Sequence, residues 1–167
     1  MDKIEFQQLA ASHRQPVMRI FNHYVKNGTA AFADKELPET FYSRILERTE
    51  GYPAYAVVDG ETKETVGFCF LSAYKPVPTF AQTAAITSFI APSHLGLGIG
   101  RVCLGRLEED ALKQGIHHII AEISSENEQS MSFHARHGFV LAGRLKNVGF
   151  KLNRAFDIVY MQKDLKG

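Results

Sequence analysis

Hydrophobic residues follow two different periods along the chain, and the way these periods alternate predicts a mixed α/β fold. A short alternating pattern at 4–9 indicates an edge strand, and apolar residues from about Gln15 to Val25 recur at helical spacing. A second helix is expected from Pro38 to just before Gly51. Two further runs, 54–59 and 65–71, flank a polar turn and are typical of a β-hairpin.

The second half of the chain alternates strands with helices. The expected segments are a strand at 86–90, a helix from about 99 to 114, a strand at 117–123, a short helix at 127–138, and strands at 139–145 and 156–162. This order predicts a largely antiparallel sheet with one parallel crossover through the central helix. Because 167 residues is the length of one domain, we expect a single domain over residues 1–167.

Three glycines at alternate positions, Gly96, Gly98 and Gly100, join the strand at 86–90 to the central helix. Glycines in such a turn leave backbone N–H groups unobstructed at the positive end of a helix, which is the geometry of a phosphate site. The stretch lacks the Gly-Lys-Ser/Thr of a Walker loop and the G-x-G-x-x-G spacing of a dinucleotide fold. Two interpretations stay open, a metal-free diphosphate site and a purely structural turn.

Composition narrows the functional classes. The net charge is +1, with lysine and arginine scattered through the sequence, so no nucleic-acid surface is expected. The charged N-terminus and the lack of an apolar run of about 18 residues argue against a signal peptide or a membrane span. Cys69 and Cys103 stand alone in apolar segments, which favours buried thiols in a reducing compartment, and we expect a cytoplasmic protein.

The element order and several short motifs together resemble the GNAT superfamily of acyl-CoA N-acyltransferases. The stretch 95–100, Leu-Gly-Leu-Gly-Ile-Gly, is similar to the pyrophosphate loop of that family, although Leu95 stands where Gln or Arg is customary. A later block of the family is matched by Asn127, Ser130, His134, Gly138 and Phe139. The resemblance implies a central, twisted, mostly antiparallel sheet with one splayed parallel pair of strands and about four helices.

Within the superfamily, the chain most resembles the phosphinothricin and methionine sulfone N-acetyltransferase branch. The cues extend over nearly the whole chain and are Phe21-Asn-His-Tyr24, Tyr52-Pro53, Ser93-His94, Asn127-x-x-Ser130-x-x-x-His134 and Val148-Gly-Phe-Lys151 before Phe156-Asp157. This resemblance implies acetyl-CoA as donor, an amino-acid-like amine as acceptor, no metal, and a homodimer with 149–151 and Asn153 in a loop at the interface.

The same resemblance assigns binding roles to particular residues. The diphosphate is expected on the N–H groups from Leu97 to Gly100, and the thioester at the splayed strand end. The implied cofactor-binding residues are Phe89, Ile90, Leu97, Gly98, Ile99, Gly100, Arg101, Asn127 and Ser130. Tyr24 and Phe32 fall on segments that line the acceptor pocket in related enzymes, and we expect them to contact the substrate; aromatic residues at helical spacing are also common in cores.

Direct attack of an amine on a thioester requires a deprotonated amine and a stabilised thiolate. His134 occupies the place where the superfamily often has a tyrosine that assists the thiolate. Histidine titrates near neutrality and could donate a proton there, or it could only cap and pack its helix. Ala85 stands where related enzymes often have a glutamate base. Either a water chain removes the proton, His94 or Glu122 is the base, or the substrate differs; Glu122 is the catalytic candidate that we name.

Two other kinds of chemistry are disfavoured. No metal site is expected, because His117 and His118 point to opposite faces of a strand and His134 and His137 lack a third ligand. Cys103 lies on the apolar side of its helix and is therefore an unlikely nucleophile.

These expectations combine into one function, the transfer of acetyl from acetyl-CoA to the amine of a small amino-acid-like acceptor. The acceptor is of the phosphinothricin or methionine sulfone type, and attack is direct, in a ternary complex without a covalent enzyme intermediate. Two alternatives stay open. The acceptor is instead a polyamine, an aminoglycoside or a protein N-terminus, or the chain is a catalytically weak acyl-CoA-binding sensor.

Overall fold

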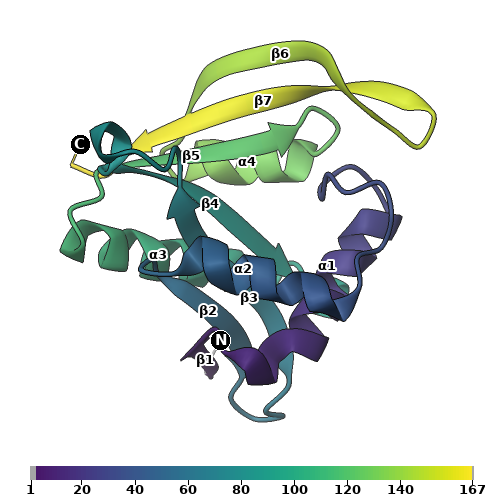
Figure 1. Ribbon diagram of the computed structural model, residues 1–167, viewed down its shortest axis with the longest axis vertical. Helices are drawn as coiled ribbons and strands as arrows, with labels where there is room; N and C mark the ends of the chain where they lie inside the picture. Colours follow the sequence, from purple (N-terminus) through teal and green to yellow (C-terminus); the bar gives the residue numbers. More distant parts are fainter. Residues whose placement is uncertain (1–2, 167) are drawn as a thin grey trace.

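A seven-stranded sheet forms the centre of the molecule, with the strand order β1-β2-β3-β4-β5-β7-β6 (Figure 1). The computed structural model describes residues 3–166. The strands are β1 (Ile4–Gln8), β2 (Ala54–Asp59), β3 (Thr65–Ala73), β4 (Thr83–Ile90), β5 (His118–Ser124), β6 (Val140–Lys151) and β7 (Arg154–Asp164). Neighbouring strands are antiparallel except for β4 and β5, which are parallel.

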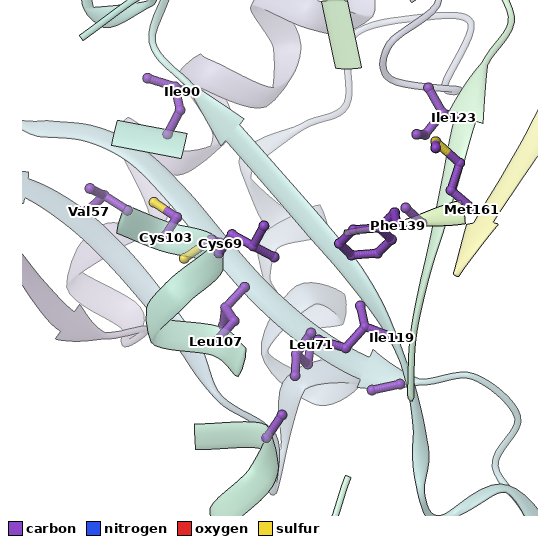
Figure 2. Packing of buried hydrophobic residues seen from close by; sticks show 14 of the residues in the cluster. Val57, Cys69, Leu71, Ile90, Cys103, Leu107, Ile119, Ile123, Phe139 and Met161 are labelled. Atoms are coloured by element: carbon purple, nitrogen blue, oxygen red, sulfur yellow. The ribbon is translucent and has the colours of Figure 1, made fainter. Parts of the chain in front are cut away.

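Four α-helices cover the two faces of this sheet. They are α1 (Arg14–Lys26), α2 (Tyr42–Thr49), α3 (Ile99–Lys113) and α4 (Glu128–Arg136). Apolar residues of α1 and α2 pack on one face, against Phe68 and Phe70 of β3. Residues of α3 and α4 pack on the other face, where Cys103 and Leu107 lie beside Cys69 (Figure 2). The predicted mixed sheet with one parallel pair and four helices is therefore confirmed.

The parallel pair separates soon after it begins. Strands β4 and β5 pair at three positions, of which the last joins Ala85 to Ile120. Beyond that point β4 continues to Ile90 beside β3, and β5 continues to Ser124 beside β7. A gap therefore opens between the second halves of two adjacent strands in the middle of the sheet.

Two expectations about strand limits were wrong. The central strand begins at Thr83 instead of 86, because residues 83–85 pair with β5. The last two strands are much longer than expected and extend beyond the other strands as a hairpin (Figure 1). Residues 149–151 therefore lie in β6 and not in a loop, and Gly149 is opposite Phe156. A Cβ atom at Gly149 would collide with the Phe156 ring, so this position needs a glycine.

Candidate active site

Strand β4 presents unpaired peptide groups to the gap. The Ala91 N–H donates to the Val66 carbonyl at 2.8 Å, and Ile90 is opposite Gly67 in the register of β3 and β4. In an antiparallel ladder this arrangement makes Ile90 a non-hydrogen-bonded position, so its own N–H and carbonyl point away from β3. Ser88, two residues earlier, is also a non-hydrogen-bonded position, so its N–H and carbonyl point away from β3 as well. These groups face the side from which β5 has withdrawn. The Ile90 N–H and the peptide groups of Ser88 are the ones with which an extended ligand can pair as an added strand, because the Ile90 carbonyl accepts from Tyr24.

Helix α1 supplies one wall of the gap. The Tyr24 hydroxyl donates to the Ile90 carbonyl. The Tyr24 ring packs 5.1 Å from the Phe89 ring, centroid to centroid, and Phe21 packs on the same ring at 5.8 Å. Burial raises the pKa of Tyr24, so its hydroxyl stays protonated and remains a donor. The expected substrate contact Tyr24 thus lies at the end of β4.

The glycine turn leads directly into α3. Gly96 and Gly98 have φ values of 76° and 80°, in the left-handed region that favours glycine. Gly98 is the N-cap residue of α3 and makes no side-chain cap, so the N–H groups of Ile99, Gly100 and Arg101 have no acceptor within the helix. These donors lie at the positive end of a 15-residue helix dipole, which suits an anion.

Helix α4 forms the opposite wall, and its first turn is capped from within. The Asn127 side-chain oxygen accepts from the Ser130 N–H at 3.1 Å. His134 Nδ1 lies 2.7 Å from the Ser130 carbonyl, which can only accept, so Nδ1 carries the proton. The Nε2 atom of the neutral ring is then a proton acceptor. Burial and the neighbouring His137 lower the pKa of His134, partly offset by the Ser130 carbonyl, which favours this neutral form.

A cavity of about 560 Å³ joins the strand gap, the glycine turn and α4. The expected residues that line it are Tyr24, Phe89, Ile90, His94, Gly98, Ile99, Gly100, Arg101, Asn127, Ser130 and His134. Leu97, Phe32 and Glu122 do not line it. Another hollow of about 590 Å³ lies by Glu47 and Glu50 and shares no residue with the glycine turn, so we assign the candidate site to the first cavity.

Glu122 and Phe32 lie outside this cavity. Ile123, the neighbour of Glu122 in β5, packs in the core on the α3 side, so Glu122 points to the α1 side. The Tyr160 hydroxyl lies 3.4 Å from its carboxylate. Phe32 is 45% exposed and stacks on Phe156 with 6.3 Å between ring centroids. Ala85 faces the same side as Glu122, since it is paired with Ile120.

Sequence reasoning missed several cavity residues. Helix α4 also contributes Gln129, Phe133, Arg136 and His137, and the loop after α1 contributes Ala30. Phe133 and His137 recur at helical spacing with Ser130 and His134, so the face of this helix was the available signal. Ala30 carries no such signal, because its position depends on the path of a loop.

Within residues 3–166, no group of three or more His, Cys, Asp or Glu side chains is placed to hold a metal ion. None of the helices in this part of the chain is both long enough and apolar enough to cross a membrane.

Comparison with known proteins decides the family. Residues 17–139, well over half of the chain, match the Acetyltransferase (GNAT) family. The chain belongs to the GNAT family. This GNAT chain is accordingly an N-acetyltransferase.

Relatives of this GNAT chain also agree with the predicted branch. The phosphinothricin N-acetyltransferase of Alcaligenes faecalis is 32% identical over 151 residues, which cover 89% of this chain and 76% of that protein. The L-methionine sulfoximine/L-methionine sulfone acetyltransferase of Pseudomonas paraeruginosa is 30% identical over 153 residues, covering 89% and 87%. The structure of yncA, a putative acetyltransferase from Salmonella typhimurium with its cofactor acetyl-CoA, has a TM-score of 0.87 and 25% identity, covering 97% and 94%.

Proposed function

We propose that the protein transfers acetyl from acetyl-CoA to the amine of a small amino-acid-like acceptor of the phosphinothricin or methionine sulfone type. The observation that carries this proposal is the cavity in which the unpaired peptide groups of β4 lie between the start of α3 and His134. A diphosphate on the α3 amides and a pantetheine arm along β4 would bring the thioester to the end of the gap. The names of the relatives support the acceptor class.

Catalysis in this proposal is direct. The amine nitrogen attacks the thioester carbonyl carbon, the new C–N bond forms, and the C–S bond breaks to release CoA as a thiolate. A peptide N–H of β4 that faces the gap, such as that of Ile90, would stabilise the negative oxygen of the intermediate. The nitrogen must lose one proton, and the sulfur must gain one.

We assign His134 a role in that proton transfer. Its neutral Nε2 can accept a proton from the attacking nitrogen and then return it to the departing sulfur, so the ring works as a carrier and not as a donor alone. Glu122 with Tyr160 is the candidate that removes the first proton from the ammonium, because both face the side of the sheet opposite the cofactor-binding helices. Ala85 on that face contributes no acid.

The proposal includes a homodimer and a cytoplasmic location. Strand β6 exposes Val140, Leu141, Leu145, Val148 and Phe150, which is an unusual density of apolar side chains for an edge strand. The two cysteines are unpaired and buried, which suits a reducing compartment.

The test is release of CoA thiol from acetyl-CoA with a panel of acceptors, namely amino acids, methionine sulfone, methionine sulfoximine, phosphinothricin, polyamines, an aminoglycoside and short peptides. We expect release that depends on the amino-acid analogues. Release with polyamines or peptides alone would move the function to a different amine. Tight acetyl-CoA binding without release for any acceptor would favour the sensor alternative.

A further inference from the structure

Lys151, at the end of β6, is a buried cation with an incomplete set of partners. The residue is only 5% exposed, and its Nζ donates to the Ala31 carbonyl at 2.9 Å. An ammonium has three hydrogens to donate. Within residues 3–166, Nζ has no second hydrogen-bond partner and no carboxylate within 4.0 Å. A buried charge without an opposite charge is costly, so such a group points to a ligand that completes it.

The other cations of the β6–β7 hairpin are already paired. Arg144 Nε donates to Asp157 at 2.7 Å, and Arg154 Nε donates to Glu126 at 2.6 Å. For Lys151, burial lowers the pKa, and the exposed Asp34 raises it without making an ion pair. Lys151 therefore differs from Arg144 and Arg154, each of which has a carboxylate partner.

Lys151 lies next to the loop that borders the cofactor cavity. Ala31, its partner, follows Ala30, which lines that cavity. The same loop is fixed to the end of β5, because the Thr29 hydroxyl lies 2.7 Å from the Ser124 hydroxyl and donates to Glu126 at 2.9 Å. The loop after α1 rises toward the hairpin in Figure 1, and the hydrogen bond from Lys151 to Ala31 connects the two.

Lys151 does not line the cavity itself, and its link to the cavity runs through Ala31 and the neighbouring Ala30. The cavity is lined by α3 and α4 on one side and by Tyr24 and Ala30 on the other, so a cofactor held by α3 and α4 leaves the side of Tyr24 and Ala30 for the amine. Phe156, which is opposite Gly149 on the same hairpin as Lys151, stacks on Phe32 of the loop after α1. An amino acid has its carboxylate one carbon away from its amine. The ammonium of Lys151 and the acceptor carboxylate are complementary in charge, and the loop at Ala30 and Ala31 connects the lysine to the cavity.

We propose that Lys151 binds the carboxylate of the acceptor through the hydrogens that Ala31 leaves free, and so selects amino acids over amines without a carboxylate. This inference rests on the proposed function, because it requires an amino-acid-like acceptor. It adds a substrate-binding residue and a reason for selectivity.

The test compares Lys151→Met with the unchanged enzyme on two acceptors, methionine sulfone and its carboxamide, which has the same shape but no negative charge. We expect kcat/KM for methionine sulfone to fall by about 30-fold or more in the variant, since one partner of a buried charge pair is lost. For the carboxamide we expect a fall of no more than about 3-fold, because that acceptor does not use the charge.

Two control variants separate binding from loop placement. Thr29→Val loosens the same loop from the β5 side without touching the ammonium, so it should slow both acceptors by the same factor. Lys146→Met removes an exposed lysine of the same strand and should change neither. Thermal unfolding and acetyl-CoA affinity of each variant show whether the fold and the cofactor site are intact.

The outcomes distinguish the two proposals. An equal loss on both acceptors in Lys151→Met would overturn the inference and make Lys151 a structural contact of the loop, while the proposed function would stand. If the unchanged enzyme acetylated only amines without a carboxylate, the acceptor class and the role of Lys151 would both be wrong.

Discussion

The imidazole of His134 shows how one hydrogen bond sets the chemistry of a residue. Its place in the sequence suggests a proton donor to the leaving thiolate. In the structure, Nδ1 donates to the Ser130 carbonyl, so the neutral ring offers only a lone pair at Nε2. The ring must therefore take up a proton before it can give one, and the attacking nitrogen is the group that has one to lose.

Replacement of His134 by Gln should lower kcat by about 100-fold and leave the KM for acetyl-CoA nearly unchanged. The active form of the ring is neutral, so kcat at saturating acceptor should fall as the pH drops through the pKa of His134. Burial holds that pKa below its ordinary value of 6.5, so this decline lies on the acid side of 6.5 and should vanish in the variant. Steady-state pH profiles of the two proteins check this; a decline that persisted in the variant would contradict it.

The start of helix α3 is the element that binds the cofactor in our proposal, and its geometry depends on glycine. Gly98 has a φ of 80°, where any other side chain is strained by about 1–2 kcal/mol, so Gly98→Val should displace the first amides of the helix. We expect acetyl-CoA affinity to fall at least about 10-fold, measured by calorimetry. Undiminished affinity in this variant would show that the turn is purely structural.

Gly105 gives the matched control, because it lies in the same helix, is exposed, and has open space where a Cβ would be. Gly105→Ala should leave acetyl-CoA affinity unchanged and stabilise the protein by about 0.5–1 kcal/mol, since it removes a flexible residue from a helix interior. Thermal or denaturant unfolding measures that gain.

For the whole molecule, the exposed apolar side of β6 is the feature that the isolated chain leaves unexplained. Phe150 is 74% exposed, the largest value among the exposed large hydrophobic residues described. If β6 packs against a second copy, Phe150→Asp should convert a dimer to a monomer, as seen by light scattering after size-exclusion chromatography. Leu112→Asp, on the exposed side of α3, should leave the dimer intact. A chain that is monomeric without any substitution would contradict the proposed homodimer.

The sequence was sufficient for the order of elements and for the glycine turn, because both depend on local patterns such as the continuous apolar run after Thr65. It was insufficient where structure depends on contacts between distant segments. Asn147 adopts a φ of 57° inside β6, so an asparagine and a glycine two residues later look like a loop in the sequence. Only the structure shows that Phe156 packs against Gly149 there. The contact of Lys151 with Ala31 was equally hidden, since the two residues are 120 positions apart.

The two cysteines have a practical consequence for measuring this enzyme. Cys69 and Cys103 are fully buried, and a hydrogen bond between them together with burial raises the pKa of the Cys69 thiol. A thiolate is the form that reacts with disulfide reagents, so neither side chain should react quickly while the protein is folded. A colorimetric thiol reagent added during the reaction would therefore measure the released CoA with little signal from the protein's own thiols. The same reagent under denaturing conditions should titrate two thiols per chain.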